Sequence, residues 1–594
     1  MIPNRYALQV VTRFAAILLA AALVSSWCWP GPVQAAGMVT AEGNIVRVET
    51  KTLKAVLDRG LLTSLVRKSD GAELVKASAD ERQALLLVYT GGTTATLGYE
   101  IGDRVRCLQI NDNLVHVRVE SWYGDGVIAV SADTESGDLI IEPSAYASRP
   151  GLRACRWVLA GIQPGLELIA PFFQGVRLAF AEPLVKDSHW PWPHSWEAGL
   201  VILQGAKGGL WVHCRDSQYR YKSLKVGTPG DERSLGFDTD AYGPLDNSLG
   251  AGGLAWRINV YAGGWEEPAA VYREWLAKAY GMENRTRPQW VERVKLALSW
   301  VRSDPALLEA LSAKVKPERI LLHVSDWRSD GYDQNYPTYE PSRQGEQFIR
   351  KAIEMGFHAM PHFNSVDMDP THPTYNYIRD FQYRDLETRR VQGWSWYQGS
   401  TKPVPESNAA RMRHQSENTM VKVHPGLSMW RSILAENILP AARRLSLEVV
   451  FLDVTLCCWN IHNTLVENTT PAQGMKELEA LIGSLGGGLV VGGEGRNEIT
   501  MQDQQFSQVH LYQSWQSNRE GLERLVTCPL NEYLFGKWSR SFGYTRLSGR
   551  TEEEVLRHKL HADLGAIPTI TVRSAEEITN PNPAVKAILE EAAR

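Results

Sequence analysis

The sequence has few cysteines, no basic run and no long apolar segment after its first residues. Seven cysteines are scattered through 594 residues, and the adjacent pair Cys457-Cys458 lacks the spacing of a metal site, so packing in a loop is the preferred interpretation. A chain this long can build its core without disulfide bonds, although one or two remain open in an exported protein, with pairings that the sequence does not assign. The net charge of −4 and the lack of a basic run argue against nucleic-acid binding.

Residues 1–35 have the pattern of an export signal. Arg5 and Arg13 supply positive charge, Phe14–Val24 is a short apolar run, and the segment ending at Ala35 fits the small-residue cleavage pattern. We therefore expect a signal peptide and a periplasmic or extracellular protein. The alternative is an uncleaved N-terminal anchor, although the apolar run is short for a membrane span. No later segment is long and apolar enough to span a bilayer, so no integral membrane segment is expected after signal removal.

Residues 40–265 contain many short strand patterns separated by turns. Ile45–Thr50 alternates apolar and polar residues, and Glu197–Gln204 and Gly209–Arg215 form a convincing hairpin pattern. No helix-length periodicity occurs before the end of this range, which favours a large antiparallel β super-sandwich. Residues 266–290 then form a connector, because Glu266–Gly281 has helical spacing and ends at a glycine.

The loop His189–Trp196 holds three tryptophans and two histidines among prolines. Such a rigid loop presents large flat rings, so Trp192 and Trp196 are candidates for stacking on sugar rings at a domain boundary. The alternative is that these tryptophans fill the interface between two domains. The sequence favours neither interpretation over the other.

From residue 291 to 594, short apolar strands alternate with amphipathic helices, which is typical of a parallel sheet and predicts a (β/α)8 TIM-type barrel. An aromatic-rich insertion at 370–425 interrupts the pattern, and its length favours a functional role. The predicted strands are Val294–Val301, Arg319–Trp327, Phe357–Phe363, Leu447–Val454, Leu489–Gly493, Val509–Trp515 and Ala566–Val572. The predicted helices are Pro305–Lys314, Gly345–Met355, Ser428–Arg444, Pro471–Leu485 and Pro583–Ala593.

Two of these strands end in a carboxylate. Asp453 ends the strand that begins at Leu447, and Glu494 ends the next one. Active sites of such barrels lie at the carboxyl ends of the strands, and a retaining glycosidase needs one ionised and one protonated carboxyl group. We expect Asp453 to be the nucleophile and Glu494 the acid/base, with Glu498 and Asp367 in reserve. The structural alternative, for Asp453 and likewise for Glu494 between its glycines, is a carboxylate that caps the following loop.

Polar and aromatic side chains gather at the same ends of the strands, which makes the set a candidate sugar site. Asp326 would accept hydrogen bonds from sugar hydroxyls, and Arg496 would lower the pKa of the nucleophile or bind a hydroxyl. The predicted substrate-binding residues in the barrel are Trp300, His323, Asp326, Trp327, His362, Asn364, Asp367 and Arg496. We expect no cofactor and no metal site.

Several segments resemble known glycosidases. The opening IVRVETKTLKAVLDRGLLTSLVRKSDGAELV is similar to the start of the galactose-mutarotase-like sandwich that precedes many glycosidase barrels. The segments WPWPHSWEAGLVILQGAKGGLWVHCRD, GGWEEPAAVYREWLAKAYG, VVFLDVT and VVGGEGRNE resemble bacterial secreted proteins near the endo-α-N-acetylgalactosaminidases and, more distantly, the α-galactosidases. The resemblance implies a retaining mechanism with an aspartate nucleophile on the fourth strand and a glutamate acid on the next, which Asp453 and Glu494 match.

The sequence thus predicts an exported glycoside hydrolase that acts on α-linked sugars of an oligosaccharide or glycan. One alternative is a catalytically silent carbohydrate-binding protein, in which the two carboxyl groups would point apart. A second is a metal-dependent hydrolase built on His358, His362, Asp367 or His372, which would still need a third ligand in tetrahedral geometry. The sequence gives no sign of the oligomeric state.

Overall fold

The structure is a computed structural model that describes residues 38–80, 83–182, 188–228, 231–397, 400–413, 418–511 and 522–594. Residues Val39–Arg594 form one compact unit. The predicted signal peptide, residues 1–35, lies outside the described residues. Within the described ranges, none of the helices is long and apolar enough to cross a membrane.

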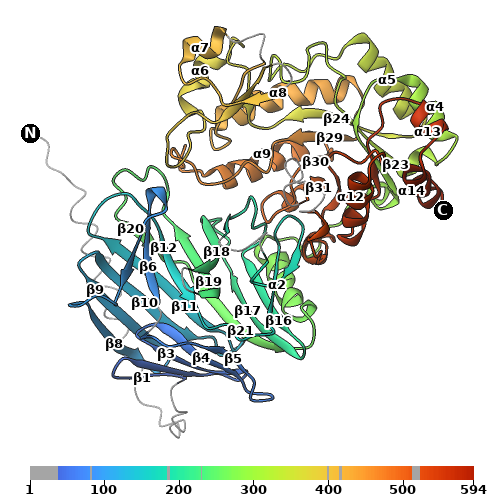
Figure 1. Cartoon of the computed structure of the whole chain (residues 1–594). Helices are drawn as coiled ribbons and strands as arrows, with labels where there is room; N and C mark the ends of the chain where they lie inside the picture. Colours follow the sequence, from blue (N-terminus) through green and yellow to red (C-terminus); the bar gives the residue numbers. More distant parts are fainter. Residues whose placement is uncertain are drawn as a thin grey trace, which may run out of the picture. The chain divides into compact units, whose positions relative to one another are not determined.

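The N-terminal half is built from three antiparallel sheets (Figure 1), which confirms the predicted β-sandwich. The sheet orders are β1-β2-β3-β4-β5, then β14-β13-β16-β17-β21-β11-β10-β9-β8 with β20 beside β11, and β15-β18-β19-β12-β6-β7. Alternate residues of β9 and β10 are buried, as expected for sheets with one face on a core. The strands are β1 (Val39–Glu42), β2 (Ile45–Glu49), β3 (Leu53–Asp58), β4 (Leu61–Arg67), β5 (Glu73–Lys76), β6 (Leu85–Tyr89), β7 (Thr94–Leu97), β8 (Arg104–Asn111), β9 (Leu114–Ser121), β10 (Gly124–Ala132), β11 (Leu139–Ala147), β12 (Leu152–Leu159), β13 (Glu167–Ala170), β14 (Val176–Leu178), β15 (His189–Pro191), β16 (Leu200–Gly205), β17 (Gly208–Cys214), β18 (Lys222–Thr228), β19 (Asp231–Asp240), β20 (Gly250–Gly252) and β21 (Trp256–Ala262).

The C-terminal half contains a parallel sheet of eight strands in the order β32-β31-β30-β29-β24-β23-β22-β33. A parallel bridge between Phe542 and Ile567 brings the two ends of the sheet together, so the barrel is nearly closed. This confirms the predicted barrel architecture. The strands are β22 (Leu296–Val301), β23 (Ile320–Val324), β24 (His358–Asn364), β29 (Val449–Asp453), β30 (Val490–Glu494), β31 (Gln504–Val509), β32 (Arg540–Gly543) and β33 (Thr569–Ile570).

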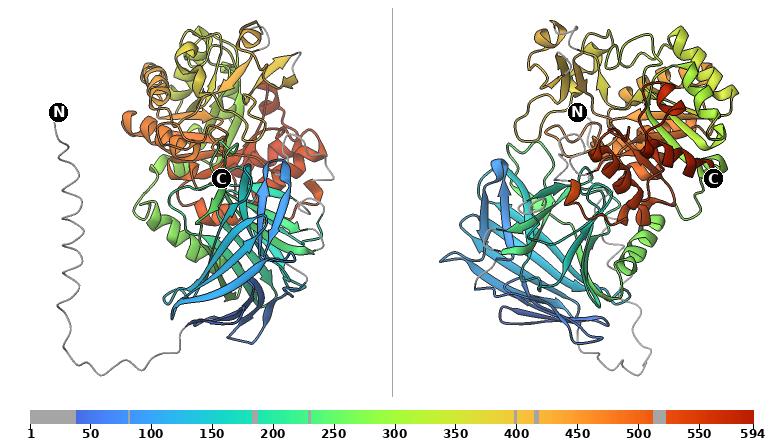
Figure 2. Two further views of the ribbon diagram at one scale, coloured as in Figure 1. Left: turned by 90° about the vertical axis from the view of Figure 1, so that its left-hand side faces the viewer. Right: turned by 45° about the vertical axis from the view of Figure 1, so that its right-hand side comes forward.

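Helices pack around the outside of the parallel strands (Figure 2). The starts of α9 and α12 are fixed by capping boxes, in which Thr470 pairs with Gln473 and Thr551 with Glu554. The helices are α2 (Glu266–Ala279), α3 (Gln289–Arg293), α4 (Pro305–Ser312), α5 (Arg343–Glu354), α6 (Tyr375–Ile378), α7 (Asn408–Arg413), α8 (Ser428–Arg444), α9 (Pro471–Leu485), α11 (Leu530–Phe535), α12 (Glu552–Asp563), α13 (Glu576–Thr579) and α14 (Pro583–Ala593).

Two strands of the barrel differ from the sequence prediction. The sixth strand was expected at Val509–Trp515, but β31 ends where that range begins, and residues 512–515 lie outside the described residues. The strand β32 was not predicted, because its four residues include arginine, serine and glycine and only one large apolar side chain, Phe542. Both differences change which residues stand at the carboxyl ends of these strands. Residues at those ends supply side chains of the candidate site.

The barrel interior is filled by apolar side chains from every second strand position, including Met360, Phe451, Phe506 and Phe542. Gly492 in β30 makes room for this core, because a Cβ there would lie 2.7 Å from the Met360 sulfur. A second apolar cluster joins the sandwich to the barrel through α2 and α11. Its members include Ile169, Leu200, Trp211, Tyr272, Leu276, Leu530 and Phe535.

The aromatic-rich insertion carries its own four-stranded sheet, in the order β25-β28-β26-β27. Its strands are β25 (Asp367–Met368), β26 (Gly393–Tyr397), β27 (Ser400–Lys402) and β28 (Met420–Lys422). The pairing of Asp367 with Lys422 ties this sheet to the segment that follows β24. The insertion is therefore anchored at the carboxyl end of the barrel.

Candidate active site

Asp453 and Glu494 are the last residues of the neighbouring parallel strands β29 and β30. The strands pair Leu452 with Gly493, and each acid is the next residue of its strand, so the register places Asp453 opposite Glu494. Parallel strands lie about 4.8 Å apart, which places the two carboxyl groups on the same rim. The backbone N–H of Val454 donates to Glu494 Oε2 over 3.2 Å, so the glutamate side chain lies against the residue that follows Asp453.

The backbone around these acids is strained and firmly held. Val454 has a φ of +65°, which is costly for a β-branched residue and is typical of functional sites. The Thr455 hydroxyl accepts from the Glu494 N–H and donates to the Glu494 carbonyl, over 2.9 and 2.7 Å. These contacts join the ends of the two strands through the backbone of Glu494.

Asp453 is only 4% exposed and is surrounded by ring side chains and other acids. The Tyr332 hydroxyl donates a long hydrogen bond of 3.4 Å to Asp453 Oδ2, and His362 Nε2 lies 3.5 Å from the same oxygen. Burial and the charge of Glu494 raise the pKa of Asp453 well above its usual range. Burial also lowers the pKa of His362 well below its usual range, which keeps that imidazole neutral.

Glu494 has a different environment. It is 8% exposed, and His510 Nε2 lies 2.8 Å from its Oε1. The His510 ring contacts the Tyr544 ring at 4.3 Å between centroids. His510 and Tyr544 follow the ends of β31 and β32, the two strands whose positions the sequence did not give. With the correct strand ends, the same rule that identified Asp453 would have identified both residues.

A cavity of about 660 Å³ is lined by Tyr332, whose hydroxyl donates to Asp453, and by Tyr544, whose ring contacts His510. Asp453 and Glu494 themselves are not among its lining residues. Asp326, a predicted site residue, is exposed on its wall and accepts from the Ser303 N–H and hydroxyl over 2.7 and 3.0 Å. The aromatic residues on its walls are Trp300, Tyr332, Trp396 and Tyr544. Flat rings around a polar rim are suited to sugar binding, since sugars combine apolar ring faces with hydroxyl groups.

The insertion contributes to this cavity through Trp396. The indole N–H groups of Trp394 and Trp396 both donate to Asp333 Oδ2, over 2.8 and 2.7 Å. Asp333 is fully buried, and its other oxygen, Oδ1, has no hydrogen-bond partner among the described residues. Burial and the charge of Asp367 raise the pKa of Asp333 to about 7. No sequence pattern indicates Asp333, which lies in a loop after β23.

The raised pKa of Asp333 predicts a pH-dependent stability. The folded form holds its proton up to about pH 7, whereas the unfolded form loses it near its ordinary pKa of 3.8, so the stabilisation is fully present below pH 3.8 and is lost as the pH rises through about 7. We expect the free energy of unfolding of Asp333→Asn, taken relative to that of wild type, to rise by about 1–3 kcal/mol between about pH 5 and pH 8. Denaturant titrations at both pH values measure this; an unchanged difference between the two proteins would contradict it.

Lys422 and Asp367 form a buried ion pair next to the two candidate catalytic acids. Lys422 Nζ lies 3.0 Å from Asp367 Oδ1, and Asn364 Nδ2 donates to Asp367 Oδ2 over 2.9 Å. Burial opposes the charge on Lys422, but attraction to Asp367 together with that of other neighbouring groups outweighs burial and raises the lysine pKa. Asn364 and Asp367 therefore brace the site, and Lys422 supplies the positive charge for which Arg496 was predicted.

Arg496 is fully buried and points away from Asp453. Its guanidinium donates to Gln174 Oε1 over 3.0 Å and to Glu532 Oε2 over 2.6 Å, which joins the sandwich to the barrel. The predicted role in substrate binding is corrected to a structural one. Glu498, a reserve acid, is also committed to this junction, because it accepts from Trp192 Nε1 over 2.7 Å and from the Tyr272 hydroxyl.

The two predicted tryptophans of the 189–196 loop are buried. Trp192 and Trp196 are 1% and 0% exposed, and Trp196 Nε1 donates to the Leu200 carbonyl over 2.9 Å. The predicted stacking of these two rings on a sugar is corrected to packing: Trp192 lies at the junction with the barrel, where it contacts Glu498, and Trp196 packs inside the sandwich against Trp256. His194 of the same loop contacts the Trp459 ring at 5.1 Å between centroids, and the nearby charges of His510 and Glu494 affect its pKa, which burial lowers to about 4. The sandwich therefore reaches the site through His194.

The remaining predicted residues lie below the rim or on it. Trp300 lines the cavity, with a φ of +62° that is unusual for a bulky residue. His323 and Trp327 are fully buried; the His323 ring packs on Phe451 and Trp327 Nε1 donates to the His362 carbonyl. These two side chains support the site from below and offer no surface to a sugar.

The metal alternative does not fit the positions of its histidines. His358 begins β24 and His362 lies four residues on, about 13 Å along the strand. His358 Nδ1 lies 2.5 Å from Glu448 Oε1, at the end of the barrel opposite to the candidate site. Within the described ranges, no group of three or more His, Cys, Asp or Glu residues is arranged to hold a metal ion.

Comparisons with known proteins identify the fold. The quadruple mutant of α-N-acetylgalactosaminidase NagBb from Bifidobacterium bifidum matches with a TM-score of 0.65 and 12% identity, over 92% of each chain. Its ligand-free form matches with a TM-score of 0.63 and 12% identity, over 93% of each chain. The α-galactosidase AgaB from Geobacillus stearothermophilus matches at 0.49 and 10% identity, over 93% of this chain and 85% of that one. A search of the curated proteins found no match.

The model of the family described as a domain of unknown function, DUF6259, matches residues 254–546, which hold the end of the sandwich, the connector and most of the barrel. At 12% identity the likeness to NagBb concerns the fold, and it confirms the predicted resemblance at that level. The chain therefore shares with an α-N-acetylgalactosaminidase the arrangement of a β-sandwich followed by a barrel.

Proposed function

We propose that the protein is a retaining glycoside hydrolase that cleaves α-linked sugars. The observation that carries this proposal is the pair of carboxyl groups, Asp453 and Glu494, at adjacent strand ends. Tyr332, which donates to Asp453, also lines the aromatic cavity. Retaining glycosidases have their two carboxyl groups about 5–5.5 Å apart, a separation that neighbouring strand ends allow. The shared fold with an enzyme named as an α-N-acetylgalactosaminidase makes α-linked galactose-type sugars the first substrates to test.

In this mechanism Asp453 attacks the anomeric carbon while Glu494 protonates the leaving oxygen, and Glu494 then activates the water that releases the sugar. In the free protein, burial and the charge of Glu494 raise the pKa of Asp453 and so oppose the ionised form that attack requires. A sugar in the site brings partial positive charge to Asp453 and excludes water. That charge favours the ionised aspartate.

The direct test is hydrolysis of a panel of aryl α- and β-glycosides and oligosaccharides by the full-length protein. We expect cleavage of at least one α-glycoside with release of the α-anomer first, which NMR detects before the sugar equilibrates. First release of the β-anomer would show inversion and overturn the retaining mechanism. If no glycoside is cleaved but sugars bind, the protein is a silent carbohydrate-binding protein. Export remains a proposal that rests on residues 1–35.

A further inference from the structure

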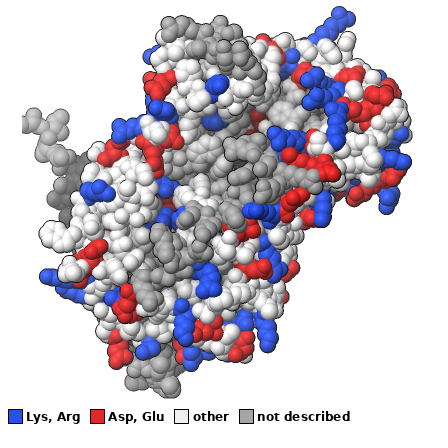
Figure 3. Space-filling view, in the orientation of Figure 1, with Lys and Arg blue, Asp and Glu red and all other residues white. Residues whose placement is uncertain are grey.

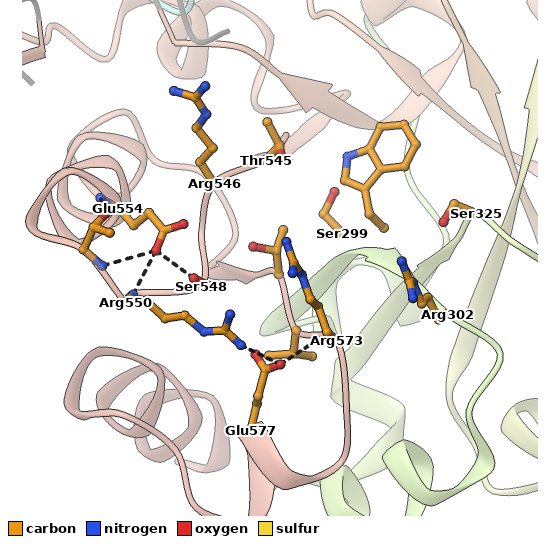
Figure 4. A pocket seen from close by; sticks show the side chains of 14 residues that line it. Ser299, Arg302, Ser325, Thr545, Arg546, Ser548, Arg550, Glu554, Arg573 and Glu577 are labelled. Carbon is orange, nitrogen blue, oxygen red and sulfur yellow. Dashed lines mark hydrogen bonds and ion pairs between the residues drawn. The ribbon is translucent and has the colours of Figure 1, made fainter. Parts of the chain in front are cut away.

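A second cavity, of about 500 Å³, opens at the carboxyl ends of β22, β32 and β33 (Figure 4). This volume falls within the range of small-molecule sites, about 300–1,000 Å³. Its walls carry four arginines and two glutamates, and most of the other lining residues have hydroxyl groups. The residues are Ser299, Trp300, Arg302, Ser325, Thr545, Arg546, Ser548, Arg550, Thr551, Glu554, Thr571, Val572, Arg573 and Glu577.

The two glutamates are already occupied. Glu554 caps α12 and accepts from the Ser548 hydroxyl over 2.7 Å and from the Arg550 N–H over 2.9 Å. Glu577 pairs with the Arg550 guanidinium over 2.7 Å and accepts from the Arg573 N–H over 3.1 Å. Arg550 is therefore paired with Glu577, and Arg546 lies 3.3 Å from Glu553, which is outside the lining. Glu554 keeps its charge among neutral donors, so two arginines, Arg302 and Arg573, stand against one carboxylate.

Arg302 and Arg573 are both exposed on these walls. Within the part of the chain that the structure describes, neither guanidinium has a carboxylate at ion-pair distance, and Figure 4 draws no contact from either group. The chain as a whole is acidic, with a net charge of −4, and both signs of charge are interspersed over the face shown in Figure 3. A positive cavity in such a protein is a local feature that favours an anionic ligand.

The arginine cavity adjoins the aromatic cavity that Tyr332 and Tyr544 line. The two share Trp300, Arg302, Ser325 and Thr545 as wall residues. A sugar next to Trp300 can therefore place a substituent among the arginines. Guanidinium groups bind carboxylate and sulfate oxygens through paired, charge-assisted hydrogen bonds.

We propose that the arginine cavity binds the carboxylate or sulfate group of an acidic sugar, so that the preferred ligand is an anionic glycan. The inference rests on the proposed glycosidase function for its substrate but makes a separate claim about binding. A free phosphate or a nucleotide is less suited, since the cavity is continuous with a site lined by sugar-sized aromatic faces.

The test measures binding, independently of hydrolysis. Uronate-containing oligosaccharides and their carboxyl-reduced forms, and sulfated galacto-oligosaccharides and their desulfated forms, are titrated into the full-length Glu494→Ala protein by calorimetry. We expect one acidic form to bind roughly 10-fold or more tighter than its neutral partner. The arm that responds identifies carboxylate or sulfate. Equal binding of both members of each pair, or binding of inorganic sulfate alone, would overturn the proposal.

Arg573→Gln in the same background is expected to weaken binding of the acidic form by roughly 10-fold and to leave the neutral form unchanged. The matched control is Arg443→Gln, an exposed arginine in the last turn of α8, which should change neither. Loss of acidic preference in the control variant as well, or none in Arg573→Gln, would refute the assignment. If binding depends on Arg573 but wild type hydrolyses no glycoside, only the glycosidase proposal is rejected. If wild type hydrolyses a glycoside but binding does not depend on Arg573, only the proposed role of the arginine cavity is rejected.

Discussion

Asp453→Ala is expected to lower kcat/KM for an aryl α-glycoside by roughly 10⁴-fold or more, because no other group can take over covalent attack. Azide restores turnover in a cavity of this kind by entering the space of the lost carboxylate. It attacks the sugar from the face that Asp453 occupies, so the product is the β-glycosyl azide. NMR of the product identifies the anomer.

Glu494→Ala differs in two measurable ways. Its kcat/KM is expected to fall by about 10²–10⁴-fold, and by less for substrates whose leaving group needs no proton. Azide then attacks the glycosyl-enzyme from the opposite face and gives the α-glycosyl azide. Glu340→Gln, an exposed carboxylate of the same barrel, is the control and should keep full activity. Exchanged anomers would make Glu494 the nucleophile, and an active Asp453→Ala would remove Asp453 from the mechanism.

The fold and the two acids were predictable because their signals are local. Five apolar residues, Val449–Val454 apart from Asp453, make a strand buried on both faces, and an acid at its end is costly unless it is used. Helices α8, α9 and α14 were predicted with their observed bounds, since apolar spacing and, for α9 and α14, an N-terminal cap and proline mark them.

The partners of the acids were less predictable, because they depend on tertiary contacts. Arg496 follows Glu494 by two residues, yet its side chain turns to Gln174 and Glu532. The burial of Trp192 likewise depends on Glu498, which lies about three hundred residues away in the sequence. Sequence spacing specifies which strand end a residue occupies. The direction of its side chain depends on which groups, distant in the sequence, form hydrogen bonds or ion pairs with it.

Lys422→Met is expected to reduce the free energy of unfolding by about 3–5 kcal/mol at neutral pH, because it leaves Asp367 buried without a counter-ion. Both side chains are almost fully buried, so water cannot replace the lost partner. Denaturant titration measures the loss. An isolated buried carboxyl group becomes neutral when it takes up a proton, which removes the cost of burying its charge. The decrease in the free energy of unfolding should therefore become smaller below about pH 5.

The double variant Asp367→Asn/Lys422→Met separates the charge from the shape. Removing the unpaired acid should recover more than half of the lost stability, whereas a purely steric effect of methionine would remain. Lys422 lowers the pKa of Asp453, whereas Asp367 raises it more strongly. Removal of both charges should therefore make Asp453 easier to ionise, so we expect a stable double variant whose activity extends to lower pH than that of wild type. A stable double variant with the wild-type pH profile would separate this ion pair from the electrostatics of the site.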